Sequence, residues 1–188
     1  QKRTFEALSE LIQETADEIR YLESVSNSLD IALSEADLGQ IKEELTASGY
    51  VRRKFTKKKV KLTNKPMHYI SSDGYDIYVG KNNIQNDELT FSFANGGDWW
   101  FHAKGAPGSH VIVKTNGDEL PDRTFEEAGR LAAYYSKNRG SDKVEIDYIE
   151  NEACQETKRA KTRVLWFIIQ SYSLVIDSDI SNIKVVQD

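Results

Sequence analysis

Neither proline nor glycine occurs in this chain before Gly39. Over that stretch apolar side chains recur every three or four residues among glutamates and aspartates, which is the period of an amphipathic helix. The apolar positions are Phe5, Leu8, Leu11, Ile12, Ala16, Ile19, Leu22, Val25 and Leu29. A run this long without an internal cap is typical of a coiled coil or helical hairpin. We expect helix over residues 1–47, broken near residues 27–34, with a second helix over residues 35–48 that ends at Gly49.

The narrow apolar stripe and the high charge favour a solvent-exposed stalk for residues 1–50. The alternative is a surface helix that lies on its own domain. A stripe of this kind also permits self-association through a coiled coil.

From residue 67 onward the pattern changes to short strands separated by turn residues. We expect strands over residues 68–71, 75–79, 88–93, 98–103, 109–114, 143–148, 163–170 and 173–177. Ser72-Asp73-Gly74 is a hairpin signal between the first two. A helix is expected over residues 121–137, with Pro121 in its first turn and residues 124–127 as a capping box. Its inward face comprises Phe125, Ala128, Leu131, Ala132 and Tyr135.

These elements predict an α+β fold. A long helix or helical hairpin comes first, and a mostly antiparallel sheet covered by one main helix follows. We divide the chain into a helical stalk at residues 1–50, a connector at residues 51–66 and an α+β domain at residues 67–188.

Residues 98–113 contain two strand patterns around a glycine-rich turn. In the first, Asp98, Trp100 and His102 alternate with Trp99, Phe101 and Ala103. Lys104 to Ser109 supplies the turn, since glycine reaches positive φ and proline fixes its own φ. The arrangement gathers rings, imidazoles and backbone N–H groups near one loop, a surface suited to phosphates or bases. The alternative is that the rings belong to the core and the turn is only a turn.

Positive charge is concentrated in the connector. The net charge is −5, and residues 1–50 carry eleven acidic and four basic side chains. Residues 51–65 carry eight basic side chains and no acidic one. Such a block is either a solvated linker without a ligand or a surface that neutralises nucleic-acid phosphates.

The remaining signals exclude several classes of protein. No apolar run approaches the roughly 20 residues of a membrane-spanning helix, so we expect no membrane partner. The single cysteine, Cys154, fits a reducing cytoplasm. The chain begins inside an apparent helix and without methionine, so we expect a piece of a longer protein. We find no HExxH, GxSxG or Walker motif, and expect no catalysis, no metal and no cofactor.

Nucleic-acid binding has the best support among the remaining functions. Rings interleaved with cations serve RNA recognition through stacking and phosphate contacts. The candidate contact residues are Arg52, Arg53, Lys54, Lys57, Lys58, Lys59, Lys61, Asp98, Trp99, Trp100, His102, Lys104, Gly108, Ser109 and His110.

The chain resembles the NFACT family over nearly its whole length. The RNA-contacting NFACT-R domain is matched by residues 75–83, 86–90, 98–104, 108–111 and 127–136. Residues 21–25 and 43–50 resemble the end of the family's coiled-coil middle region. Where members carry a loop rich in lysine, proline and glycine, residues 152–163 here have neither proline nor glycine.

The resemblance implies a cytoplasmic role in ribosome-associated quality control. Family members of the RqcH type bind obstructed large ribosomal subunits and tRNA, and add an alanine tail to stalled chains. The resemblance implies ribosomal RNA and tRNA as partners. It also implies that this chain is a non-catalytic module, since the family's N-terminal regions are absent. The rival implication is a fibronectin-binding adhesin on the surface of a streptococcal-type bacterium, displayed without a signal peptide.

Overall fold

The computed structural model describes residues 2–52, 64–150 and 172–186. Helix α1 (Lys2–Ile31) and helix α2 (Glu35–Ala47) form the helical part, which confirms the predicted break. Ser34 caps α2, because its hydroxyl accepts from the Asp37 backbone N–H while the Asp37 carboxylate accepts from the Ser34 backbone. Gly49 follows α2 with φ of 85°, a conformation that glycine adopts without steric cost.

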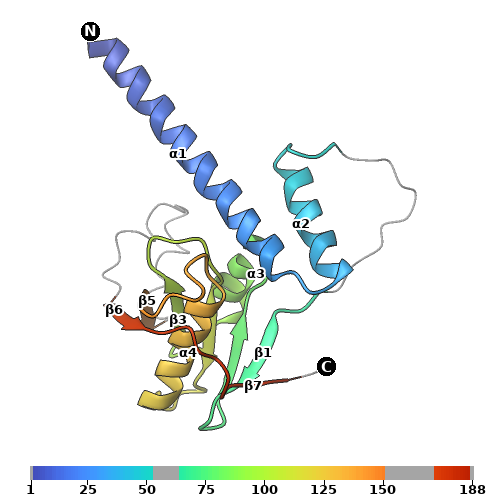
Figure 1. Cartoon of the computed structure of the whole chain (residues 1–188), viewed down its shortest axis with the longest axis vertical. Coiled ribbons are helices and arrows are strands. Elements are labelled where there is room, and N and C mark those ends of the chain that lie inside the picture. Colours follow the sequence, from blue (N-terminus) through green and yellow to red (C-terminus); the bar gives the residue numbers. More distant parts are fainter. Residues whose placement is uncertain (1, 53–63, 151–171, 187–188) are drawn as a thin grey trace.

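Most of α1 extends away from the rest of the chain as a stalk (Figure 1). Phe5 is 72% exposed, and Leu8, Leu11 and Ile19 are 54–57% exposed. Its buried side chains come late in the helix, at Val25, Asn27, Ser28 and Ile31, where α1 meets the sheet domain. The solvent-exposed stalk is the correct alternative of the two raised by the sequence.

This exposure gives a first prediction. Replacing Leu8, Leu11 and Ile19 together with serine should change the unfolding free energy of the sheet domain by less than about 0.5 kcal/mol, because these side chains touch little within the chain. Urea unfolding followed by tryptophan fluorescence measures it. Leu131→Ala is the matched control, since Leu131 is fully buried in the core between α4 and the sheet and its loss should cost about 2–4 kcal/mol. Equal losses in the two variants would contradict the prediction, and sedimentation of the triple variant tests self-association.

The sheet is antiparallel at every described pairing. Its strands are β1 (Met67–Ile70), β2 (Asp76–Val79), β3 (Trp99–Ala103), β4 (Val111–Lys114), β5 (Val144–Glu150), β6 (Tyr172–Ile176) and β7 (Lys184–Val185). They lie in the order β6-β5-β3-β4-β2-β1-β7. The α+β class and the antiparallel sheet are confirmed; β7 was not predicted, and the expected strand at 163–170 lies outside the described residues.

Helix α4 (Asp122–Tyr134) covers one face of the sheet (Figure 1). Ala128, Leu131 and Ala132 are fully buried against Ile77, Phe101 and Val113 and their neighbours, as the helical period predicted. The predicted capping box is wrong. Pro121 occupies the N-cap, while the Thr124 hydroxyl bonds Ser71 and Asp73 and the Glu127 carboxylate accepts from the Ser72 N–H at 2.8 Å. These side chains hold the β1–β2 hairpin because the hairpin lies against them.

The predicted strand at residues 88–93 is also wrong. Helix α3 (Asn83–Glu88) runs into one turn of π-helix, η1 (Leu89–Phe93). Asn82 caps α3 by accepting from the Gln85 N–H, and the Ala94 N–H donates to the Leu89 carbonyl. Leu89 and Thr90 are both buried while Phe93 is 38% exposed, so burial does not follow the alternation of residue types from which the strand was predicted. The alternation of residue types in this short run did not predict which side chains are buried. The backbone is helical here because the cap at Asn82 starts a helix that continues into η1.

Candidate nucleic-acid interface

Strand β3 divides the predicted ring-bearing residues between the two faces of the sheet. Trp99, Phe101 and Ala103 face α4; the Trp99 ring lies 5.7 Å from the Phe125 ring, centroid to centroid. Trp100 lies on the other face, against Ile112 and Ile149. We call this second side the outer face. The predicted alternation is therefore confirmed.

On the outer face the rings of Trp100, His102 and His110 form a compact group, the imidazole cluster. The two imidazole centroids are 5.3 Å apart, and each lies 5.2–5.7 Å from the Trp100 ring. The His110 Nδ1 is 2.8 Å from the Thr90 hydroxyl. Strand β3 supplies Trp100 and His102, the loop before β4 supplies His110, and η1 supplies the Thr90 hydroxyl that bonds it, so the cluster exists only in the folded chain.

The expectation of exposed indoles is wrong. Trp100 is only 5% exposed because η1 covers it, and Trp99 packs in the core beside Phe125 and Tyr148. Neither ring is presented as an open platform for a base. A contact role for either residue stays a prediction that requires the outer face to open.

Both imidazoles are neutral at neutral pH. Burial lowers the pKa of His102 to about 4, against the opposing effects of the Asp147 carboxylate and a hydrogen bond to the Gly108 backbone. Burial, and to a smaller extent the neighbouring His102, lower the pKa of His110 to about 3, against the opposing effect of a hydrogen bond to the Asn86 backbone. The cluster therefore offers hydrogen bonds rather than positive charge.

Three of the candidate residues shape the loops beside the cluster. The buried Asp98 carboxylate accepts from the backbone N–H groups of Asn95 and Thr115 and pairs with Lys114. Gly108 lies so close to Ser136 that a Cβ there would come within 3.0 Å of the serine Cβ. Ser109 is 1% exposed. Direct nucleic-acid contact by these residues stays a prediction.

Three basic residues lie on two loops that meet at one end of the sheet. The β3–β4 loop carries Lys104, and the segment after α4 carries Lys137 and Arg139; all three are exposed. The Lys137 N–H donates to the Pro107 carbonyl at 2.9 Å, which brings the loops together (Figure 1). We call Lys104, Lys137 and Arg139 the cationic rim. The Arg139 guanidinium lies 3.8 Å from the Tyr134 ring centroid.

Sequence reasoning found only one of the three rim residues. In the sequence, Lys137 and Arg139 lie at the end of a predicted helix and in the turn after it. Cations are common at such places because they complement the helix dipole. Their approach to Lys104 depends on the Gly108–Ser136 bridge, a contact between residues far apart in the sequence. Local sequence patterns do not report such a pairing.

Of the connector cations, Arg52 and Lys65 are described, and both are exposed. Arg53, Lys54, Lys57, Lys58, Lys59 and Lys61 lie outside the described residues. Just before Arg52, the Tyr50 hydroxyl donates to Glu18 on α1 at 2.6 Å, and Lys137 of the rim pairs with Glu23 on α1 at 2.6 Å. Five helical residues, about 7.5 Å of axis, separate these two anchor points. The start of the connector and the rim are thus held near the same section of the stalk.

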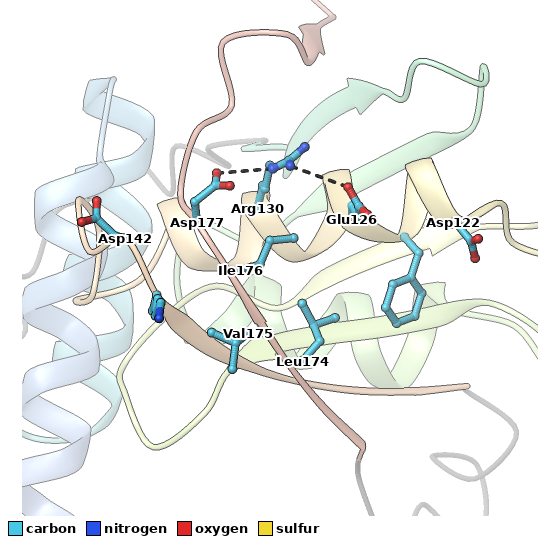
Figure 2. A pocket seen from close by; sticks show the side chains of 10 residues that line it. Asp122, Glu126, Arg130, Asp142, Leu174, Val175, Ile176 and Asp177 are labelled. Atoms are coloured by element: carbon cyan, nitrogen blue, oxygen red, sulfur yellow. Dashed lines mark ion pairs between the residues drawn. The ribbon is translucent and has the colours of Figure 1, made fainter.

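A hollow of about 650 Å³ between α4 and β6 is a poor phosphate site (Figure 2). It is lined by four acidic residues, Asp122, Glu126, Asp142 and Asp177, and two basic ones, Arg130 and Lys143. Figure 2 shows Arg130 between two of the acids, 3.3 Å from Asp177 and 3.6 Å from Glu126. Acidic side chains therefore outnumber basic ones in the hollow. In the rim two of the three cations pair with a carboxylate, Lys104 with Glu145 and Lys137 with Glu23, so positive charge is in excess there and the rim is the better candidate for phosphate contact.

Within the described ranges, no cluster of three or more histidine, cysteine, aspartate or glutamate side chains is arranged to hold a metal ion. Over the same ranges, no helix combines the length and apolar character needed to cross a bilayer.

Comparison with known families divides the chain at the end of the connector. The family model described as "NFACT protein RNA binding domain" matches residues 65–166, and "NFACT N-terminal and middle domains" matches residues 1–64.

Relatives in bacteria and animals carry names from ribosome quality control. "Rqc2 homolog RqcH" of Streptococcus suis is 47% identical over 150 residues, 79% of this chain and 27% of its own length. The Bacillus subtilis protein of that name is 37% identical over 163 residues, 85% of this chain and 28% of its own. "Ribosome quality control complex subunit NEMF" of Mus musculus is 37% identical over 81 residues, 42% of this chain and 8% of its own. The chain thus spans about a quarter of the length of the bacterial relatives.

A solved structure shares the fold. It is the C-terminal part of the fibronectin/fibrinogen-binding protein from Streptococcus suis, with a TM-score of 0.79 and 39% identity. The similarity covers 96% of this chain and 71% of that one.

Proposed function

The chain belongs to the NFACT protein family, and we propose that it is a non-catalytic RNA-binding module acting in ribosome quality control. The observation that carries the proposal is the gathering of exposed cations at the rim, beside a connector rich in lysine and arginine, on a chain whose net charge is −5. An acidic protein that binds RNA needs its cations focused in one place, because phosphates are repelled elsewhere.

The finer proposal assigns roles to the two surfaces. Lys104, Lys137 and Arg139 contact phosphates, and the Arg139–Tyr134 stack adds a planar surface beside them. His102 and His110 remain neutral and contribute hydrogen bonds to unpaired bases that reach the outer face. The fully buried Phe101 and Ala103 have no part in contact.

We further propose that the RNA is that of the large ribosomal subunit and tRNA. In the whole protein this module would support alanine tailing of stalled chains by holding the tRNA, while the chemistry belongs to the ribosome. This role places the protein in the cytoplasm. The names of the relatives support the proposal.

Neutralising the cations tests RNA binding. One variant changes Arg52, Arg53, Lys57, Lys58 and Lys59 to glutamine, and a second changes Lys104, Lys137 and Arg139. Each should weaken binding of tRNA or large-subunit RNA about 10-fold to 100-fold at 0.1 M salt. A side chain that no longer neutralises a phosphate no longer releases the counterions bound there, and that release favours binding. Filter binding across a salt series should show the slope of log K against log salt falling by about one for each phosphate that is no longer neutralised.

Lys2 and Arg3, exposed at the far end of α1, supply the matched control. Changing both to glutamine alters the net charge in the same direction, and we expect less than about a threefold effect on affinity. Affinity and salt slope unchanged in both cation variants would contradict RNA binding through these surfaces.

Fibronectin binding is the second candidate, favoured by the name of the structural neighbour. A sheet edge can bind an extended segment by strand addition, and β7 is a short edge strand that pairs only with β1 in the described structure. This candidate predicts saturable fibronectin binding that survives both cation variants. RNA binding that disappears in those variants, together with absent fibronectin binding, would exclude it.

A further inference from the structure

Helix α3 lies between the stalk and the imidazole cluster and contacts both. We propose that α3, continued by η1, transmits the direction of the stalk to the cluster. The proposal concerns the shape of the cluster whether or not it contacts RNA, so its test uses no RNA and can fail independently of the proposed function.

On the stalk side, amide side chains of the α3 region bind α2 and the end of the connector. The Gln40 Oε1 on α2 accepts from Asn82 Nδ2 and Gln85 Nε2, both at 2.8 Å, and from Asn64 Nδ2 at 3.1 Å. Lys81 Nζ lies 2.7 Å from both the Asp37 carboxylate and the Asn64 side-chain carbonyl oxygen. Such directional bonds fix one arrangement, because sliding the helices would break several together.

Asn83 makes the most sensitive contact at this junction. Its Nδ2 donates to Ser24 on α1 at 2.8 Å and to the Glu44 Oε1 on α2 at 2.7 Å. Glu44 is 8% exposed, and its Oε2 has no hydrogen-bond partner among the described residues. A buried carboxylate supported at one oxygen depends strongly on that donor. Removing the donor should favour separation of α2 from α3, which returns the carboxylate to water.

On the other side, α3 and η1 hold the cluster. The Asn86 Oδ1 accepts from the His110 backbone N–H at 3.0 Å, the Asn86 Nδ2 donates to the Gly108 carbonyl at 3.3 Å, and Thr90 bonds the His110 ring. The fit against the end of β2 is tight, since a Cβ on Gly80 would stand 2.2 Å from the Asn86 Oδ1. Asn86 therefore has no room to shift without moving the His110 loop.

The contacts to the stalk and the contacts to the cluster come from neighbouring residues of α3 and its cap. Asn82, Asn83 and Gln85 face the stalk junction and Asn86 faces the loop, within one six-residue helix and its cap. A displacement of α3 that follows the stalk must move Asn86 as well, because a single hydrogen-bonded helical turn moves as a unit. This shared rigid element is the physical basis for coupling the two regions.

The test disturbs Asn83 and reads both ends. Asn83→Asp sets a second carboxylate against Glu44, and the Asn83→Asp/Glu44→Gln double variant restores a donor, because the new glutamine amide faces the new carboxylate. Spin labels at Glu10→Cys and Asp118→Cys, with Cys154→Ser, report the stalk–sheet distance. Imidazole nitrogen resonances report the cluster, and the indole nitrogen of Trp99, which packs against Phe125 on the opposite face of the sheet, is the internal reference.

We expect Asn83→Asp to broaden the label distance distribution about twofold and to shift the His110 resonances while the Trp99 indole resonance stays unchanged. The double variant should reverse both effects. Asn182→Asp, at an exposed turn, is the matched control and should change neither. Gln40→Leu provides a second means of opening the junction. If neither variant broadens the distance, or if the distance broadens without movement of His110, the proposal is overturned.

Discussion

Replacing Asp37 with asparagine is expected to cost about 3–5 kcal/mol of unfolding free energy, the cost of breaking a buried ion pair by removing one charge. Asp37 is 1% exposed, and its carboxylate lies 2.7 Å from Lys81 Nζ. It also accepts from Asn64 Nδ2 at 2.6 Å and from the backbone N–H groups of Leu33 and Ser34. The substitution leaves the Lys81 ammonium, 13% exposed, without a counter-charge, and it weakens the capping box of α2 because a neutral amide oxygen is a poorer acceptor than a carboxylate.

Urea unfolding of Asp37→Asn, Lys81→Gln and the double variant measures the effect. The double variant should be less destabilised than the sum of the two single variants by at least about 1 kcal/mol, because no unpaired charge remains buried in it. Asp17→Asn is the matched control, since that carboxylate pairs with Arg20 on the exposed stalk and should cost less than about 0.5 kcal/mol. A loss below about 1 kcal/mol in Asp37→Asn would contradict the assignment of a buried, essential pair.

The second large effect is a loss of stability in acid through the imidazole cluster. Burial lowers the pKa of His102 to about 4 and that of His110 to about 3, from an ordinary value of 6.5. Between the lowered pKa values and 6.5, the two histidines bind protons in the unfolded chain but not in the folded chain. The stabilisation is therefore complete above about pH 6.5 and declines as the pH falls toward about 4 and 3.

Because both rings keep some exposure, we expect the pair together to account for a loss on the order of 3 kcal/mol between about pH 7 and pH 4. Urea unfolding at a series of pH values measures it. The His102→Gln/His110→Gln variant should show a flatter profile than the wild type over this window. Identical profiles for the wild type and the double variant would contradict the prediction.

Asp37 acts in a different pH window, which keeps the two effects separate. Burial is the largest single influence on its pKa and raises it, but hydrogen bonds from Lys81, Asn64, Leu33 and Ser34 together lower that pKa to about 2. The carboxylate therefore contributes stability above about pH 4 that disappears only as the pH falls toward about 2. Its substitution should alter the profile below about pH 4 and leave the histidine window unchanged.

The local patterns that succeeded are those in which sequence neighbours decide the conformation. The period of three and four residues, followed by Ser34 and Asp37, placed the two helices and the break between them. Ser72-Asp73-Gly74 placed a hairpin, because glycine supplies the positive φ that the turn needs. Strict alternation in residues 98–103 assigned each side chain to the correct face of β3.

The patterns that failed are those in which distant partners decide the outcome. Residues 88–93 alternate in type but form a π-turn, since the Asn82 cap starts a helix and Leu89 packs on Trp100. Thr124 and Glu127 have the spacing of a capping box, yet the β1–β2 hairpin takes their hydrogen bonds. For the same reason, sequence assigned Trp100 to the outer face but did not reveal that η1 covers it.

What the sequence determined and what the tertiary structure decided differ in how far apart in the chain the interacting residues lie. Sequence alone determined the α+β class, the stalk, the resemblance to the NFACT family and the concentration of positive charge in the connector, because each depends on composition or on residues a few positions apart. Tertiary structure alone brought Lys137 and Arg139 to Lys104, set Glu44 against Asn83, and closed the imidazole cluster. Those arrangements join residues from about 10 to about 40 positions apart, and the packing of the folded chain is what brings them together.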